Sequence, residues 1–267
     1  MGAMIPVPEP VVQPIVEEQR LREIGMRYLV ARPGTSAVER VLVAVHGVSR
    51  EWREMADHLL GPCLEARTAL IVPRFSRSGY RGFQRLEVGR KGVAADHALL
   101  TVLDDAAQRF EIAPTAEVLL FGYSGGAQFA HRFSLAHPDR VRRQALAAAG
   151  FYTMPDTASR YPYGLAPGGR FGSLDMSGLL LPTKVLVGEL DTDRDPQLRT
   201  GRSLDRQQGR NRVERARRFV LATRILAGSC RRPPDCSFEI LRNCGHSFVE
   251  CAEKGDLARK VVDFLVR

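Results

Sequence analysis

The chain has 267 residues, of which 44% are hydrophobic and 26% are charged, and its formal net charge is +9. This composition is typical of a globular protein with a substantial core, and no run is long and apolar enough to span a bilayer. The positive charge comes almost entirely from arginine, and no nucleic-acid-binding motif accompanies it, so nucleic acid is not the expected partner.

Residues 1–25 are expected to form an N-terminal arm ahead of the folded domain. The first 14 residues are rich in proline and valine and lack the basic region and apolar stretch of a signal peptide, which favours a cytoplasmic protein. The chain has 5 cysteines, an odd number, and they do not have zinc-site spacing, so free thiols are expected.

From residue 26 onward, short apolar runs alternate with longer segments of helical periodicity. The runs predict strands at Met26–Ala31, Val41–Val45, Ala69–Val72, Val118–Phe121, Gln144–Ala149, Lys184–Val187 and Phe238–Leu241. The periodic segments predict helices at Glu51–Leu64, Val93–Phe110, Ala127–His137, Asn211–Ala227 and Phe248–Val266. This alternation indicates an α/β fold with a mainly parallel, doubly wound sheet and helices on both faces.

Residues 26–267 are expected to form one domain, which residues 151–181 interrupt as a small lid-like insert. The insert has its own composition, rich in tyrosine, methionine, proline and glycine. Its aromatic side chains are candidates for the wall of a substrate pocket, in particular Tyr152, Tyr161 and Tyr163. A surface excursion fixed by its aromatic residues is the alternative interpretation.

The segment Leu119–Ala127 carries the candidate nucleophile. An apolar strand ends in Gly122-Tyr123-Ser124-Gly125-Gly126, and a helical segment follows at once. The order strand, sharp turn and helix places a serine at the apex of a strained turn, with glycines where strand and helix approach each other. Ser124 is therefore the predicted nucleophile.

Ser124 needs a base, and a base of this kind needs an acid to orient it. His246, after the last predicted strand, and an aspartate in the loop after the strand before it fit these roles, since active residues of parallel sheets lie at the carboxyl ends of strands. The chain order serine, aspartate, histidine and the Gly-x-Ser-x-Gly turn resemble the α/β-hydrolase superfamily, over roughly residues 40–267. The resemblance implies an acid three residues after the glycine that closes the strand, which is Asp191, with Asp193 and then Asp195 as alternatives.

The resemblance implies an oxyanion hole made of two backbone N–H groups. One is that of Gly125, directly after the nucleophile. The other follows the strand that ends in His46-Gly47, where the superfamily points to Val48, with Ser49 as the alternative. Within the superfamily the chain looks like the small carboxylesterases and the polyhydroxybutyrate-depolymerase-like hydrolases.

The resulting prediction is a carboxylesterase-like serine hydrolase that cleaves an ester-like bond of a small acyl substrate through a Ser-His-Asp triad and an acyl-enzyme. No metal or organic cofactor is required. The alternatives are a ligand-binding protein with little turnover on the same scaffold, or an acyltransferase or peptidase that uses the same triad.

Two segments are rich in arginine and could bind an anion, namely Arg74–Gly92 and Asn211–Ala227. The first is expected to be a solvated loop and the second a helix with a solvated arginine face.

Overall fold

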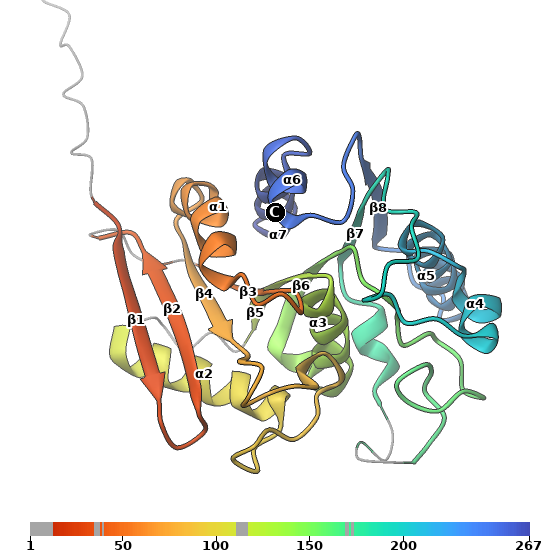
Figure 1. Ribbon diagram of the computed structural model, residues 1–267, viewed down its shortest axis with the longest axis horizontal. Coiled ribbons are helices and arrows are strands. Elements are labelled where there is room, and N and C mark those ends of the chain that lie inside the picture. Colours follow the sequence, from red (N-terminus) through yellow and green to blue (C-terminus); the bar gives the residue numbers. More distant parts are fainter. Residues whose placement is uncertain (1–12, 35–37, 39, 111–116, 169–170, 172–173) are drawn as a thin grey trace, which may run out of the picture.

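The computed structural model describes residues 13–34, 38, 40–110, 117–168, 171 and 174–267. They contain one eight-stranded sheet with the strand order β1-β2-β4-β3-β5-β6-β7-β8 (Figure 1). The strands are β1 (Ile15–Leu21), β2 (Met26–Arg32), β3 (Arg40–Val45), β4 (Thr68–Arg74), β5 (Val118–Tyr123), β6 (Val141–Ala147), β7 (Thr183–Gly188) and β8 (Cys236–Leu241). Only β2 runs antiparallel to the others in this sheet, which confirms the predicted mainly parallel α/β architecture.

Helices cover both faces of the sheet. They are α1 (Trp52–Glu65), α2 (Ala95–Phe110), α3 (Gly125–Ala136), α4 (Arg202–Gln208), α5 (Arg212–Ser229), α6 (Phe248–Glu253) and α7 (Leu257–Leu265). One core cluster joins the sheet to α1, α6 and α7, and a second joins it to α2, α3 and α5. Successive strand residues serve opposite faces, so in β3 Leu42 packs toward α1 while Val43 packs toward α3. The strands of the centre are continuously apolar for this reason.

The structure differs from the sequence-based expectation at three places. The expected arm contains β1, while its residues 1–12 lie outside the described part of the chain. The short helix α4 was not anticipated. The expected C-terminal helix is two helices, because the chain turns between α6 and α7 and Asp256 adopts a left-handed φ of 52°. β1 and α4 are short and rich in charge, so apolar periodicity does not reveal them.

The first part of the 151–181 insert packs into the protein. Phe151, Tyr152 and Met154 are buried. The fully buried Arg132 of α3 donates hydrogen bonds to Gln84 O at 2.5 Å and to the hydroxyl of Thr153 at 3.1 Å, and its guanidinium lies 4.6 Å from the Phe151 ring centroid. These contacts fix the insert to α3.

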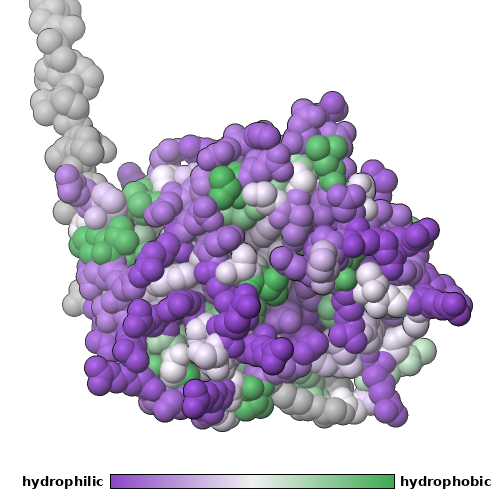
Figure 2. All heavy atoms as spheres, in the orientation of Figure 1, coloured by the Kyte–Doolittle hydropathy of each residue, from purple (hydrophilic) through white to green (hydrophobic). Residues whose placement is uncertain are grey.

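Hydrophilic side chains predominate on the face shown in Figure 2. In the described part of the chain no helix has the length and apolar character needed to cross a membrane.

Candidate active site

The turn between β5 and α3 holds Ser124 in a strained conformation, with φ 53° and ψ −111°. Its N–H bonds to Ala147 O at 2.8 Å, which fixes the turn against β6. A Cβ atom on Gly122 would lie 2.2 Å from Gly126 O, and one on Gly126 would lie 1.8 Å from Val45 O. Glycine is therefore required at both positions, and the close approach directs the Ser124 side chain out of the sheet edge.

Three side chains from three loops form a continuous line of hydrogen bonds. Ser124 Oγ lies 3.1 Å from His246 Nε2, and His246 Nδ1 lies 2.7 Å from Asp191 Oδ2. Because the buried carboxylate only accepts, Nδ1 carries the proton and donates, which leaves Nε2 free to accept from the serine hydroxyl. The structure thus brings together the residues predicted as nucleophile, base and acid.

The loops that carry the base and the acid pack directly on each other. Leu190 N donates to Cys244 O at 2.9 Å. A Cβ atom on Gly188, the last residue of β7, would lie 2.3 Å from the same oxygen. Gly245 N, directly before His246, donates at 2.8 Å to Oε2 of Glu250, which lies after His246 in α6. These contacts fix the loop around His246 at both ends and set the position of its ring.

Arg212, from the first turn of α5, holds the other oxygen of Asp191. Its Nη1 lies 3.1 Å from Asp191 Oδ1 and also donates to Asp195, and both Arg212 and Asp191 are buried. Arg215, one turn further along, is fully buried as well. The expectation of a solvated arginine face on this helix is wrong at these two positions, because their guanidinium groups pair with buried or partly buried oxygens. Sequence reasoning missed the part of Arg212 in the site.

The geometry distinguishes the three aspartates that were candidates for the acid. Asp191 contacts His246, Asp193 is exposed, and Asp195 bonds to Arg212. Partial burial acts to raise the pKa of Asp195, but the hydrogen bond and the charge of Arg212, together with the hydrogen bond from Gln197 N, outweigh it and hold that pKa below its usual value. Of the three, Asp191 has the position that an orienting acid requires.

Two backbone N–H groups lie beside Ser124, as expected for an oxyanion hole. Gly125 is the first residue of α3, so its N–H has no acceptor within the helix. The Val48 nitrogen lies 3.3 Å from the place where a Cβ atom of Gly125 would stand, and no described residue accepts a hydrogen bond from it. The hydroxyl of Ser49 donates to Glu51, and this bond leaves the backbone N–H of Ser49, the alternative donor, a candidate.

His46 fixes the peptide that carries the Val48 N–H. The Nε2 atom of His46 accepts from Phe75 N at 3.0 Å, so Nδ1 bears the proton and donates to Gly47 O at 2.8 Å. In a trans peptide the C=O and N–H point in opposite directions, so holding Gly47 O directs the Val48 N–H the other way. Burial lowers the pKa of His46 to about 4, which keeps the ring neutral at ordinary pH.

A cavity of about 250 Å³ opens at Ser124. Its walls come from the loop after β3, the start of α1, the acid loop and the start of α6, with the lining residues Gly47, Val48, Ser49, Glu51, Met55, Tyr123, Ser124, Gln197, His246, Ser247 and Phe248. This volume is at the small end for ligand sites, so it suits a short acyl group or one unit of a longer chain. Met55, Gln197 and Phe248 were not predicted to line it.

No protein-family model and no curated protein matches the chain. Solved structures do match it. A poly(aspartic acid) hydrolase from Sphingomonas sp. KT-1 is 25% identical with a TM-score of 0.74, and the match covers 89% of this chain and 93% of the other. A poly(3-hydroxybutyrate) depolymerase from Bordetella parapertussis is 23% identical with a TM-score of 0.72, covering 94% and 87%. An S-formylglutathione hydrolase from Staphylococcus aureus is 15% identical with a TM-score of 0.62, covering 96% and 99%.

The chain is a member of the α/β-hydrolase superfamily. The strand order, the single antiparallel strand and the strained serine turn agree with this assignment, and so does the hydrolase activity that the names of the similar structures share. The resemblance predicted from the sequence is thereby confirmed at the level of the superfamily.

The three tyrosines expected at the pocket of this hydrolase are not among the residues that line the cavity at Ser124. Tyr152 is fully buried and stacks on Phe219, with ring centroids 4.2 Å apart. Tyr161 and Tyr163 line a separate hollow of about 690 Å³. Phe151 and Thr153 of the insert contact Arg132 of α3, and no described residue of the insert lines the cavity at Ser124.

Two cysteines lie close to His246, yet neither offers a thiolate. Burial raises the pKa of Cys251 to about 12 and also raises the pKa of Cys244. The Cys251 sulfur lies 3.6 Å from the hydroxyl of Tyr123 and 3.6 Å from Gly245 O. These cysteines pack the loop of the base, and all five cysteines are free thiols.

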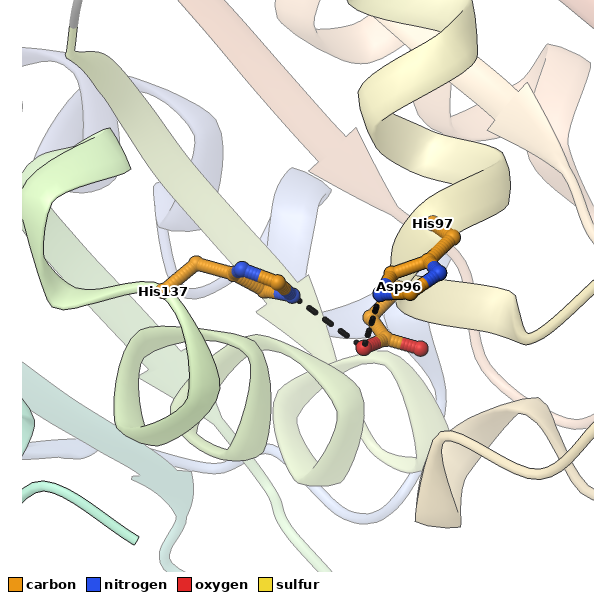
Figure 3. A group of neighbouring side chains, drawn as sticks. All are labelled: Asp96, His97 and His137. Carbon is orange, nitrogen blue, oxygen red and sulfur yellow. Dashed lines mark hydrogen bonds and ion pairs between the residues drawn. The ribbon is translucent and has the colours of Figure 1, made fainter. Parts of the chain in front are cut away.

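One group of side chains in the described part of the hydrolase could hold a metal ion, and it lies away from Ser124. Asp96 and His97 at the start of α2 face His137 after α3, with candidate ligand atoms within 4.8 Å of one another (Figure 3). His137 Nε2 lies 3.1 Å from the buried Asp96 carboxylate. Since α3 begins at the nucleophile and His137 follows its last residue, roughly 18 Å of helix separates the two sites. The group joins α2 to α3 and has no part in the site at Ser124.

Proposed function

We propose that the chain is a serine hydrolase that cleaves an ester-like bond of a small acyl substrate. The observation that supports this most strongly is the unbroken line from Asp191 through His246 to Ser124, which ends at a cavity with two adjacent backbone N–H groups. A hydrogen-bonded serine and histidine, with an acid on the other ring nitrogen, is the arrangement that activates a serine hydroxyl for attack.

In the proposed first half-reaction, His246 Nε2 accepts the hydroxyl proton as Ser124 Oγ attacks the carbonyl carbon. The carbonyl oxygen becomes an oxyanion held by the N–H groups of Gly125 and Val48. When the intermediate collapses, the bond to the leaving group breaks and His246 returns the proton to that group, which leaves an ester on Ser124. One oxyanion donor of this kind is worth about 3 kcal/mol of the barrier.

In the second half-reaction, His246 accepts a proton from water as its oxygen attacks the acyl-enzyme. Collapse releases the acid and restores the Ser124 hydroxyl. Asp191 accepts the hydrogen bond from His246 Nδ1 and stabilises the imidazolium that forms twice in the cycle. Arg212 contributes by holding the carboxylate of Asp191 in place from the opposite side.

The size of the cavity and the similar structures guide the choice of first substrates. A cavity of about 250 Å³ favours a short acyl group. Similar structures include a poly(3-hydroxybutyrate) depolymerase and a poly(aspartic acid) hydrolase, so a polyester and a poly(amino acid) are the next substrates to test. A ligand-binding protein with little turnover is the competing function, since a triad can persist on a scaffold that has other roles.

The deciding experiment is intact-mass analysis after treatment with a fluorophosphonate, which reacts with activated serines. The wild-type protein should gain one adduct and the Ser124→Ala variant none, and only the wild type should hydrolyse p-nitrophenyl butyrate. Labelling without hydrolysis of any acyl substrate would favour the binding protein. Absence of labelling in the folded wild-type protein would contradict an activated Ser124.

A further inference from the structure

Three arginines stand side by side on three neighbouring strands. Arg20 of β1 is the direct partner of Arg27 of β2, and Arg27 is the direct partner of Arg74 of β4. Side chains at directly paired positions share one face of a sheet, and like charges there are destabilising. The protein therefore keeps a row of three cations at a cost to its stability.

The arginine row lines a hollow of about 660 Å³, together with Arg22, Lys91 and Ser76. No acidic side chain lines this hollow. Arg20, Arg22, Arg27 and Lys91 are exposed, Arg74 is half-buried, and none of the five cations forms an ion pair with any described residue.

Some surface arginines of the chain have carboxylate partners. Such pairs are Arg53 with Glu18, Arg85 with Glu87, Arg109 with Asp105, and Arg259 with Glu65. The hollow instead gathers five cations that have no counter-charge among the described residues. Such a cluster is complementary to an external anion with several charges.

Strand register places the row near the nucleophile. Ile71 of β4 is level with Val43 of β3, and Val43 is level with Leu120 of β5. Three residues further along, Arg74 is level with Tyr123, the residue before Ser124. Adjacent strands are about 4.8 Å apart, so the row begins roughly 10 Å from the nucleophile and extends to roughly 20 Å at β1.

The row also shares a face with the cavity at Ser124. Leu70 and Val72 of β4 belong to the core cluster on the α1 side of the sheet, so Arg74, two residues later, points to the same side. The cavity has Glu51 and Met55, at the start of α1, in its wall. Both features thus lie on the α1 side, at the carboxyl ends of the strands.

We propose that the hollow is a subsite for an anionic chain substrate, in which repeated carboxylates bind the five cations while an acyl linkage of the same chain reaches Ser124. This rests on the proposed hydrolase function and deepens it. A chain whose repeat contains both a carbonyl linkage and a carboxylate supplies the scissile bond and the charges together. An extended chain advances about 3.4 Å per residue, so a carboxylate three to six units from the scissile bond lies over the row.

Binding is tested without dependence on turnover. Hexaglutamate is titrated calorimetrically into the Ser124→Ala protein and into the same protein with Arg27→Gln added. Hexaglutamate should bind, hexaglutamine should not, and Arg27→Gln should weaken binding about tenfold, the value of one charge-assisted contact. Arg142→Gln is the matched control, because Arg142 is exposed and is the second residue of β6, at the amino ends of the parallel strands and so away from the row. Equal loss in both variants, or no binding of hexaglutamate, would overturn the subsite.

Turnover gives the second readout. Two matched hexapeptide p-nitrophenyl esters, one with four glutamates and one with four glutamines, are compared at low salt. The wild type should prefer the glutamate ester at least tenfold in kcat/KM, mainly through KM, and Arg27→Gln should lose most of this preference while p-nitrophenyl butyrate hydrolysis stays unchanged. Butyrate turnover without any glutamate preference would overturn the subsite alone, whereas no labelling of Ser124 would count against the hydrolase function.

Two further outcomes bear on the proposal. Arg27→Gln should raise the melting temperature slightly, because it removes repulsion from the middle of the row, and a large drop would indicate that the arginine is structural. A single-stranded oligonucleotide of equal charge should bind more weakly than hexaglutamate. If it binds equally well and with the same sensitivity to Arg27→Gln, the hollow recognises negative charge in general and the assignment to carboxylates is wrong.

Discussion

At the scale of single residues, the carboxylate of Asp191 has its two oxygens occupied by two different partners. Oδ2 accepts from His246 and Oδ1 from Arg212. An asparagine here would keep the size of the side chain but present an amide N–H₂ to one of these donors, and so favour the wrong tautomer of His246. We expect Asp191→Asn to lower kcat by roughly 10⁴-fold, measured on p-nitrophenyl butyrate.

The matched control for this change is Asp193→Asn, two residues away in the same loop. Asp193 is exposed, so its substitution removes the same charge without touching the ring of His246. We expect a change in kcat of less than about threefold, since a screened surface charge has little effect at this distance. If Asp193→Asn lost more activity than Asp191→Asn, the acid would be Asp193.

Arg212 is the second residue whose role can be measured. Its guanidinium is buried between Asp191 and Asp195, so Arg212→Met leaves a buried carboxylate with one partner fewer. Removing one member of a buried pair costs about 3 to 5 kcal/mol, which should appear in urea unfolding at pH 7. Arg217→Met, on the exposed side of the same helix, should cost less than about 1 kcal/mol. Equal costs would show that burial of the Arg212 pair contributes nothing to stability.

The sequence predicted Ser124, His246 and Asp191 because each follows an apolar run, but it did not predict Arg212. A periodicity argument assigns every arginine to a solvated face, and that assumption fails where a guanidinium has several acceptors. One signal was present in the sequence. A cation in the first turn of a helix opposes the helix dipole, so Arg212 directly after the Asn211 N-cap indicates a compensating carboxylate.

At the scale of elements, the elbow between β5 and α3 depends on the absence of side-chain atoms. Gly126→Ala would place a Cβ atom 1.8 Å from Val45 O, a backbone atom that can move only if β3 moves. We expect this variant to unfold at a markedly lower temperature or to accumulate in inclusion bodies. Gly228→Ala, near the end of α5 with open space around its Cβ position, should instead stabilise the protein by about 0.5 to 1 kcal/mol. A soluble and stable Gly126→Ala protein would contradict the tight contact.

The elements that the sequence did not predict share one property, which is the lack of a strong apolar pattern. β1 has the sequence IVEEQRL, in which only the last side chain is buried, and as an edge strand it needs little apolar surface. α4 has the sequence RSLDRQQ and is held by polar contacts from Arg194 and Arg215. Central strands were easier to predict, because burial on both faces requires continuous apolar runs. The break between α6 and α7 had a visible signal in Gly255, which the apolar pattern on either side outweighed.

At the scale of the whole molecule, two buried histidines link folding to pH. In both His46 and His131 one ring nitrogen accepts from a backbone N–H while the other donates to a backbone C=O, an arrangement that only the neutral ring can make. Burial lowers the pKa of His46 to about 4 and lowers that of His131 well below its usual value. In the unfolded chain both rings titrate near pH 6.5.

The sign of the effect follows from proton uptake. Between pH 6.5 and about 4 the unfolded state binds protons at these histidines and the folded state does not, so stability is complete above pH 6.5 and is lost as the pH falls. For His46 the loss by pH 4 amounts to roughly 3 kcal/mol. The carboxylates whose pKa values are held low by arginine, such as Asp195, add to the loss only below about pH 4, so the two contributions occupy different windows.

Urea unfolding at pH 7.5, 6.0 and 5.0 separates these windows. We expect the free energy of unfolding to fall steadily across the three values in the wild type, and to fall less steeply in His46→Gln, whose amide can still donate to Gly47 O and accept from Phe75 N without titrating. His58→Gln, a change of the same type on α1 at a partly exposed position, should leave the slope unchanged. The His46 ring also holds the peptide that carries the Val48 N–H. If the free energy of unfolding of the wild type did not change between pH 7.5 and 5.0, the argument that this ring stays neutral would fail. The explanation of how the oxyanion loop keeps its position across this pH range would then fail as well.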